Sequence, residues 1–270
     1  MRVLIVTAVP AERDAVVRGV GATAPELAEL PVPGGVLHRL SPAPPTGPPL
    51  TVDVLAAGVG PAAAAAGTAA ALTAAAVART PYDLAVSAGI GGGFGTAISN
   101  PATSPAPPAA AHLSSAAAHL GSVVVADAIV AADLGAETPD GFAAVTDLGF
   151  GTVEHLPPAP LVAAVAEATD AVRGTVLTVS TVTGSAERAA ELLRRHPRAV
   201  AEAMEGFGVA EAAAAQSVPT LEVRTVSNAV GPRDRAAWRI GEALEALTGA
   251  FATIAPLLGT WTFDPEGTRQ

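Results

Sequence analysis

Polar side chains stand at the ends of three apolar stretches in this sequence. Glu12 follows the run "RVLIVTA", Glu205 follows "RAVAEAM", and Asn228 ends "PTLEVRTVSN". Ligands of open α/β sheets bind beyond the carboxyl ends of the strands, so we expect these side chains to share one site. A carboxylate there can take a proton from water or bind a sugar diol, and an amide can pair with a purine base. Taken alone, each glutamate also fits an acidic residue in the first turn of a helix.

Arg224 interrupts the apolar stretch that leads to Ser227 and Asn228. A guanidinium inside a buried strand needs an anion or a carboxylate beside it. Glu12 or Glu205 would supply that carboxylate. The sequence therefore predicts a buried ionic cluster close to the amide.

Two glycine-rich stretches are candidates for ligand-binding turns. The stretch "GVGPAA" at 58–63 matches a dinucleotide fingerprint, which requires an acidic residue at the end of the following strand. Asp83 has about the right spacing, but it precedes the run "LAVSAG" and would lie at the wrong edge of the sheet. We therefore favour a turn that binds another small polar group. The stretch "SAGIGGGFG" at 87–95 would let a ligand approach the backbone closely, and a flexible turn is also compatible with it.

The composition excludes several classes of function. The formal net charge of −10 disfavours a nucleic-acid partner, and the absence of cysteine excludes disulfides, thiolate zinc sites and a cysteine nucleophile. The N-terminal apolar run is too short for a signal peptide, and the alanine-rich stretch after Pro61 is barely apolar. We expect a cytoplasmic protein with no membrane partner. His112 and His119 lack acidic or cysteine partners nearby in the sequence, so no metal site is predicted.

The elements that must position these residues alternate along the chain. Apolar, β-branched runs alternate with segments of helical pattern, the last of them an amphipathic helix from about 234 to 255. This pattern predicts an α/β fold in which a central, twisted, mixed and mostly parallel sheet is flanked by helices. We expect a single domain over 1–270. Two Pro-rich segments, 41–49 and 96–119, are predicted to be surface loops, the second of them flexible.

The order of these motifs resembles that of the purine nucleoside phosphorylase superfamily. The pair Met204–Glu205, then Arg224, then Ser227–Asn228, with Glu12 and a glycine turn before them, is similar to the methylthioadenosine/S-adenosylhomocysteine nucleosidase branch. Within that branch, "VVVADAIVAADLGAETPDGF" and "STVTGSAERA" most resemble the futalosine hydrolases of the alternative menaquinone pathway. The resemblance implies a nucleoside phosphorylase-like fold, no cofactor, and a homo-oligomer that is a dimer or larger.

The sequence departs from the adenine-specific branch at Asn228, where those relatives carry an aspartate. A 6-oxopurine presents acceptors at N7 and O6, which suit the N–H donors of an amide, whereas an ionised aspartate would face O6 with a lone pair. Mismatched polar groups of this kind discriminate by up to about 10⁴-fold. Asn228 therefore predicts hypoxanthine or guanine, and futalosine carries hypoxanthine. Val182 also replaces an aromatic residue beside the base, for which Phe142 or Phe207 would have to compensate.

The resemblance implies a role for each candidate residue. Glu12 would be the general base for water, Glu205 would bind the ribose hydroxyls, and Arg224 would hold the water or the carboxylates. Asn228 would stabilise the departing base. The implied substrate-binding residues are Gly89, Ile90, Gly91, Val182, Thr183, Met204 and Ser227.

The expected activity is hydrolysis of the bond between base and ribose in futalosine. Glu12 favours hydrolysis because a glutamate at that position would repel phosphate. A 6-oxopurine nucleoside phosphorylase and a non-catalytic nucleoside binder remain alternatives at this stage. Arg233 and Arg235 are both candidates to bind the distal benzoate of futalosine, and the sequence does not decide between them.

Overall fold

The computed structural model describes residues 1–22, 26–42, 49–95 and 118–261. The predicted loops at 41–49 and 96–119 therefore lie largely outside the described residues. Near the end of the second predicted loop, Ala118 is fully buried and has no regular secondary structure.

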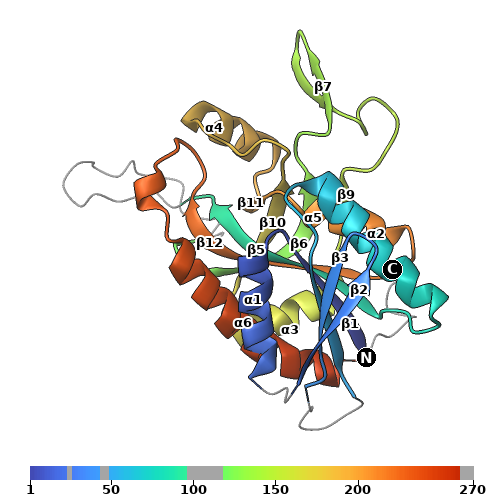
Figure 1. Cartoon of the computed structure of the whole chain (residues 1–270). Helices are drawn as coiled ribbons and strands as arrows, with labels where there is room; N and C mark the ends of the chain where they lie inside the picture. Colours follow the sequence, from blue (N-terminus) through green and yellow to red (C-terminus); the bar gives the residue numbers. More distant parts are fainter. Residues whose placement is uncertain (23–25, 43–48, 96–117, 262–270) are drawn as a thin grey trace.

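The described residues form an alternating series of strands and helices (Figure 1). The strands are β1 (Arg2–Thr7), β2 (Leu27–Val32), β3 (Gly35–Leu40), β4 (Thr51–Ala56), β5 (Leu84–Gly93), β6 (Val123–Ala131), β7 (Gly135–Thr138), β8 (Gly141–Ala144), β9 (Glu154–His155), β10 (Val172–Thr178), β11 (Ala199–Ala203) and β12 (Thr220–Ala229). The helices are α1 (Pro10–Gly21), α2 (Pro61–Val77), α3 (Ala159–Thr169), α4 (Ala186–Arg195), α5 (Gly206–Ala214), the 3₁₀ turn η1 (Arg235–Ala237) and α6 (Ile240–Thr260).

One large mixed sheet organises the molecule, as the sequence predicts. Its strand order is β11-β10-β6-β12-β5-β1-β4-β3-β2. Parallel ladders join β1 to β4 and β5, β5 to β12, and β10 to β6 and β11. Antiparallel ladders join β12 to β6 and add the β2–β3 hairpin at the far edge.

A further ladder between β5 and β11 closes part of this sheet on itself. It is antiparallel and pairs Ala201 with Gly93 and Glu202 with Gly92. Strands β5, β12, β6, β10 and β11 therefore form a ring in which each strand pairs with the next. Because the first residues of β5 pair with β1 and its last residues pair with β11, this strand connects the open part of the sheet to the ring.

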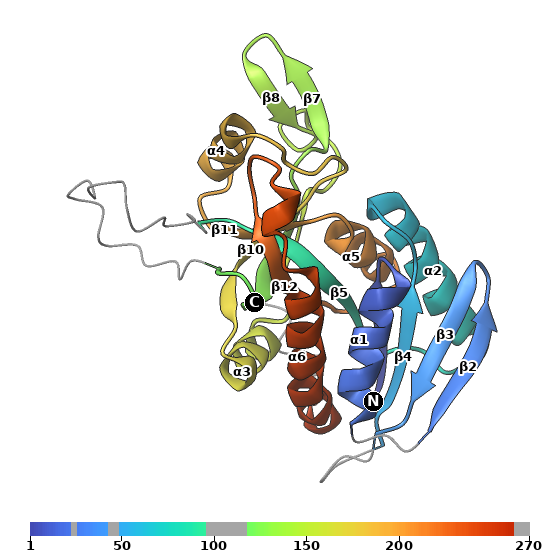
Figure 2. The ribbon, with the colours of Figure 1, turned by 60° about the vertical axis from the view of Figure 1, so that its left-hand side comes forward.

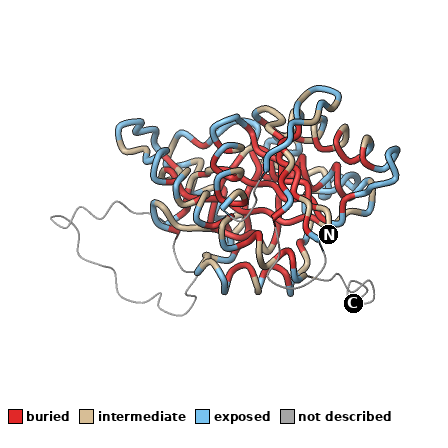
Figure 3. Tube along the Cα trace, turned by 60° about the horizontal axis from the view of Figure 1, so that its bottom comes forward, coloured by how far each residue is buried: buried red, intermediate tan, exposed pale blue. Residues whose placement is uncertain are grey.

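Helices cover both faces of the sheet (Figure 2). Helices α1, α3 and α6 pack on one face over one apolar cluster, and α2 and α5 pack on the other over a second cluster. Successive residues of β1 point to opposite faces, so Val3 and Ile5 join the first cluster while Leu4 and Val6 join the second. This two-sided burial explains why the strand is a continuous apolar run. Figure 3 shows buried residues concentrated in the interior of the molecule.

Helix α6 is long and apolar enough to cross a membrane by length and composition alone. Among the described residues it is the one helix that meets this test. Eight of its residues are buried in the protein, and it packs against α1. We therefore describe it as a core helix.

The last helix begins and ends later than the sequence pattern predicts, and two hairpins were not predicted. A helix was predicted from about 234 to 255, but η1 occupies 235–237, the chain is extended at Trp238, and α6 runs to Thr260. The hairpins β2–β3 and β7–β8 escaped prediction because their strands are short or exposed and lack a clear apolar pattern. Neither difference moves a predicted site residue.

Candidate active site

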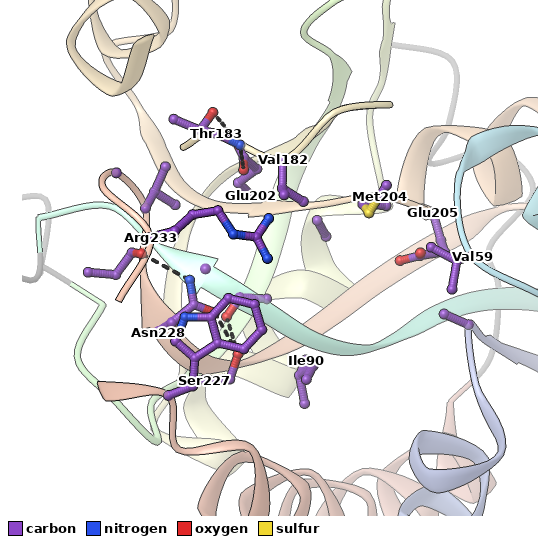
Figure 4. A pocket seen from close by; sticks show the side chains of 18 of the residues that line it. Val59, Ile90, Val182, Thr183, Glu202, Met204, Glu205, Ser227, Asn228 and Arg233 are labelled. Atoms are coloured by element: carbon purple, nitrogen blue, oxygen red, sulfur yellow. Dashed lines mark hydrogen bonds between the residues drawn. The ribbon is translucent and has the colours of Figure 1, made fainter. Parts of the chain in front are cut away.

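A cavity of about 370 Å³ opens where β5, β11 and β12 end beside the start of α1 (Figure 4). Nine of the eleven predicted site residues line it: Glu12, Ile90, Gly91, Val182, Thr183, Met204, Glu205, Ser227 and Asn228. The other two, Gly89 and Arg224, do not line the cavity. The residues converge because the carboxyl ends of β1, β5 and β12 lie at the same edge of the sheet.

Glu12 is held in the first turn of α1 by three backbone N–H groups. Its Oε2 accepts hydrogen bonds from Ala8 N at 3.0 Å and Val9 N at 3.2 Å, and its Oε1 accepts one from Ile90 N at 2.9 Å. Burial raises the pKa of Glu12, and the guanidinium of Arg224 opposes this effect. A fixed carboxylate whose pKa is raised is suited to accept a proton from water.

Glu205 lies between β11 and α5. Its Oε1 accepts a hydrogen bond from Gly60 N at 3.2 Å, and its Oε2 accepts one from Arg224 Nη1 at 3.1 Å. The glycine belongs to the stretch predicted to bind a small polar group, and in the structure this polar group is the Glu205 carboxylate. Figure 4 shows Glu205 beside Val59 and Met204 in the cavity.

Arg224 is fully buried beneath the cavity, where it holds carboxylates. Its Nε donates to Glu222 Oε1 at 2.9 Å, and its Nη2 donates to Ser87 Oγ at 2.8 Å, besides the bond to Glu205. Of the two predicted roles, holding water or holding carboxylates, this geometry agrees with the second. Arg224 is therefore a positioning residue.

Gly89 matters because it has no side chain. A Cβ at this position would lie 2.6 Å from Glu12 Oε1 and 2.8 Å from Arg224 Nη1. The glycine permits β5 to pass directly beneath the two groups. Gly89 therefore lies next to Glu12 and Arg224, and it is not among the residues that line the cavity.

Asn228 lines the cavity at the end of β12. Its Oδ1 accepts a hydrogen bond from Ser227 Oγ at 2.9 Å, and its Nδ2 donates to Ala229 O at 2.9 Å. One of the two N–H donors predicted to face the base is therefore already used. The second N–H and the remaining lone pair of Oδ1 are left for a ligand.

Comparison with known proteins agrees with this geometry. Residues 50–256 match the family model of the phosphorylase superfamily. The futalosine hydrolase of Streptomyces coelicolor is 63% identical over 261 residues, which cover 97% of this chain and 98% of that protein. The futalosine hydrolase of Acidothermus cellulolyticus is 42% identical over 98% of this chain and 93% of that protein.

The chain belongs to the futalosine hydrolase family of the phosphorylase superfamily.

Solved structures share the fold of this futalosine hydrolase family member at low sequence identity. The 5'-methylthioadenosine/S-adenosylhomocysteine nucleosidase of Neisseria meningitidis has a TM-score of 0.70 and 17% identity, covering 96% of this chain and 99% of that chain. The S-adenosylhomocysteine nucleosidase of Streptococcus pyogenes has a TM-score of 0.70 and 18% identity, covering 96% and 97%. The predicted superfamily and fold are confirmed.

The aromatic residue in the cavity of this family member is not one that the sequence analysis considered. Phe142 packs under the guanidinium of Arg195, and Phe207 contacts the ring of His155, so neither lines the cavity. Trp238 lines it instead, just after η1. The 3₁₀ turn that displaced the predicted helix brings this indole to the site.

Arg233 lines the cavity and Arg235 does not. The guanidinium of Arg233 lies over the indole of Trp238, 5.4 Å from the ring centre. It is the single basic residue among the described residues that line the cavity. Of the two arginines considered for a distal carboxylate, Arg233 is thus the one in position.

Two carboxylates of the site escaped the sequence analysis of this futalosine hydrolase family member. Glu202 lines the cavity and accepts hydrogen bonds from Thr183 N at 2.8 Å and from Thr183 Oγ1. Glu222 is buried beneath Arg224, and its Oε2 has no hydrogen-bond partner among the described residues. The period of two along β12 places Glu222 on the same face as Arg224, which is a signal that could have found it.

A metal site finds no support in the part of the chain that the structure describes. No group of three or more His, Asp or Glu side chains there could hold a metal ion. His112 lies outside the described residues. The carboxylates at the cavity are instead bound by N–H donors, a threonine hydroxyl and Arg224.

Proposed function

We propose that this protein hydrolyses the bond between hypoxanthine and ribose in futalosine, releasing hypoxanthine and dehypoxanthine futalosine for menaquinone synthesis. The observation that carries the proposal is the 63% identity, over nearly the full length, to a futalosine hydrolase. The cavity is consistent with it, because Glu12, Glu205 and Asn228 line one space.

Glu12 is the proposed general base. Cleavage of the C1′–N9 bond leaves the electron pair on the base and a cationic, oxocarbenium-like ribose, which water attacks at C1′. Glu12 takes the proton of that water, a contribution of roughly 10²–10⁴-fold to the rate. The three N–H groups that hold Glu12 fix the direction of its carboxylate.

Glu205 is the proposed ribose-binding residue. Its carboxylate accepts hydrogen bonds from the ribose hydroxyls, and its charge favours the cationic sugar in the transition state. Arg224 and the backbone of Gly60 keep it in place. Met204 is proposed to pack against the sugar, and Ile90 and Gly91 against the sugar and base.

Asn228 is proposed to bind the departing base with one N–H group and one lone pair, instead of the two N–H groups expected from the sequence. With one N–H committed to Ala229, the other donates to O6 of hypoxanthine. As the base leaves, N7 takes a proton from solvent, so the base departs in its neutral form and the free lone pair of Oδ1 accepts from N7–H. Glu12 afterwards returns the proton of the attacking water to solvent. An aspartate would also accept from N7–H but would repel O6, so the preference for a 6-oxopurine rests on the O6 contact.

The far end of futalosine carries a benzoate, and we propose that Arg233 and Trp238 bind it. A guanidinium over an indole offers a charge to the carboxylate and an apolar face to the ring. Phosphate is disfavoured as a co-substrate because Arg224 already bonds to two carboxylates and a hydroxyl.

We also infer a cytoplasmic homo-oligomer. Val9, Val59 and Val182 line the cavity with exposed side chains, and a second copy of the chain would shield such an apolar rim from water. Sedimentation velocity would show a dimer or larger species, and a monomer at micromolar concentration would contradict the inference.

The decisive experiment measures hypoxanthine release from futalosine, beside inosine and methylthioadenosine, with and without phosphate. We expect release from futalosine, independent of phosphate. A requirement for phosphate would instead indicate a phosphorylase, and release of adenine from methylthioadenosine would contradict the role of Asn228. Binding of all three nucleosides without any release of base would indicate a non-catalytic binder.

A further inference from the structure

Glu202 faces the cavity without a part in bond cleavage. It is only 6% exposed and lies on β11, three residues before Glu205. Burial raises its pKa, while the two hydrogen bonds from Thr183 oppose this effect. A buried carboxyl group is costly unless it is hydrogen-bonded, and this one also borders a ligand cavity. Its position therefore calls for a function.

The sheet places Glu202 and Asn228 on either side of one glycine. Gly92 pairs with Glu202 in the β5–β11 ladder and with Asn228 in the β5–β12 ladder. Register partners point to the same face of a sheet, and two strand spacings separate them by roughly 10 Å. Gly92, Glu202 and Asn228 all line the cavity, so the side chains of Glu202 and Asn228 border the same space.

Thr183 fixes the orientation of the Glu202 carboxylate. Its backbone N–H donates to Oε1 and its hydroxyl donates to Oε2, so each carboxylate oxygen has one bond from the protein. A carboxylate has about four acceptor sites, so lone pairs remain on both oxygens. In Figure 4, Glu202 and Thr183 lie on one side of the cavity, and Asn228 and Ser227 lie on another.

The two side chains differ in what they offer to a base. Asn228 offers a donor, and Glu202 offers acceptors. The adjacent positions of hypoxanthine are O6, which accepts, and N1–H, which donates. In adenine the corresponding positions are reversed, with a donating 6-amino group and an N1 lone pair. The order of donor and acceptor across Gly92 therefore matches the 6-oxopurine.

We propose that Glu202 binds N1–H of the hypoxanthine ring and thereby makes the site reject 6-aminopurines. The proposal rests on the proposed function, since it names the base contact of that same cavity. In adenine, the N1 lone pair would face the carboxylate oxygen with no proton between them. A site built to bond one polar pattern discriminates strongly against the other, because its own buried groups are left unpaired.

A purely structural role for Glu202, in which it only fixes Thr183, predicts something different. Glu202→Gln would then disorder the cavity wall and weaken the binding of all bases alike. If Glu202 contacts N1, the new amide can donate to the N1 lone pair of adenine, and adenine binding improves. A gain of binding separates the two roles.

The experiment is calorimetric titration of hypoxanthine and adenine into the intact wild-type protein, Glu202→Gln and Thr183→Val. For Glu202→Gln we expect hypoxanthine to bind roughly 10-fold more weakly or worse, and adenine to bind more tightly. Thr183→Val removes a hydroxyl bond but keeps the charge of Glu202. Because Thr183 holds Glu202 in place, we expect this variant to shift the ratio of the two Kd values in the same direction as Glu202→Gln, but by less.

An unchanged ratio of Kd values in Glu202→Gln would overturn the inference, whether both bases weaken equally or neither weakens. Circular dichroism and thermal unfolding would verify that both variants fold. The release assay keeps the two proposals separate. Futalosine cleavage with an unchanged ratio would overturn only the role of Glu202. A shifted ratio without futalosine cleavage would overturn only the proposed function.

Discussion

The charge distribution around Arg224 is the main feature of the site at the scale of single residues. Three carboxyl groups, those of Glu12, Glu205 and Glu222, surround one buried guanidinium. Burial raises the pKa of Glu222, as it does that of Glu12, and Arg224 opposes both effects. In the proposed mechanism, this cluster keeps the carboxyl group of Glu12 ready to accept a proton while that of Glu205 binds the sugar.

The raised pKa of Glu12 predicts the pH dependence of turnover. The base form is the ionised carboxylate, so kcat should fall as the pH decreases through a pKa above the usual range of a glutamate. The measurement is kcat for futalosine between pH 4 and 8. This range extends from about 4.3, the ordinary pKa of a glutamate, to well above that pKa. Glu12→Gln should bind substrate with a similar Kd and lose turnover. A variant that keeps wild-type turnover would refute the role of Glu12.

Gly89 is predicted to tolerate no side chain. The Cβ of Gly89→Ala would meet Glu12 Oε1 at 2.6 Å and so displace the base. A displacement of about 1 Å can cost 10²-fold, so we expect kcat/KM for futalosine to fall by about that factor.

Gly241→Ala is the matched control for Gly89→Ala. It lies in α6 with no heavy atom within 4 Å of the added Cβ, and it should leave activity unchanged. Equal activity of the two variants would contradict the account of Gly89.

At the scale of elements, Asp53 joins three strands at the edge of the molecule. It lies on β4 and accepts hydrogen bonds from Arg39 Nε at 2.7 Å, Tyr82 Oη at 2.6 Å and Arg2 Nη2 at 2.9 Å. Burial would raise the pKa of Asp53, but the bonds from Arg39 and Tyr82 outweigh it and lower the pKa. These groups connect β1, β3 and β4 without contacting the cavity.

Asp53→Asn should therefore destabilise the protein and spare its chemistry. Loss of the charge leaves buried donors poorly paired, and we expect the free energy of unfolding to fall by about 2–3 kcal/mol. Because the folded pKa is lowered, this stabilisation is fully present above the unfolded pKa and is lost as pH falls through the folded pKa. Urea unfolding at several pH values would show the free energies of unfolding of the wild type and Asp53→Asn becoming equal in acid. A constant difference between the two free energies of unfolding at every pH would contradict the role of the Asp53 charge.

At the scale of the whole molecule, the two ends of the chain support the same site. Helix α1 carries Glu12 and packs against α6, which is the last helix described. The contact is close at Gly19, where a Cβ would lie 2.4 Å from Thr248 O. Helix α6 thus fixes the helix that holds the proposed base.

Gly19→Ala should therefore lower both stability and turnover. Overpacking at such a contact costs about 1–3 kcal/mol, and the resulting shift of α1 would move Glu12 relative to Ile90. Thermal unfolding and kcat for futalosine would be measured together. Gly249→Ala, in α6 with open space around the added Cβ, is the matched control. A wild-type kcat for Gly19→Ala would show that α1 and α6 are not coupled in this way.

The sequence by itself determined the family, and it predicted residues that line the cavity. Glu205 follows β11, whose ladder with β5 is antiparallel, so its position at the cavity depends on how the sheet closes. Glu12 and Asn228 were predictable because each lies at or just after the end of an apolar strand, and the carboxyl ends of parallel strands meet at one edge of a sheet. Local order along the chain is sufficient for that inference. The alternation of elements likewise predicted the mixed sheet between two helical layers.

Only the tertiary structure decided how the cavity is completed. The β5–β11 ladder joins residues more than 100 positions apart, as Glu202 and Gly92 are. No local pattern encodes such a pairing, so neither the position of Glu202 opposite Asn228 nor its bond to Thr183 could be predicted. The same holds for Gly89 beneath Glu12 and for Trp238, which lies in extended backbone after η1 and not in the predicted helix. Strand ends are set by the sequence nearby, whereas contacts across strands depend on how the whole sheet closes.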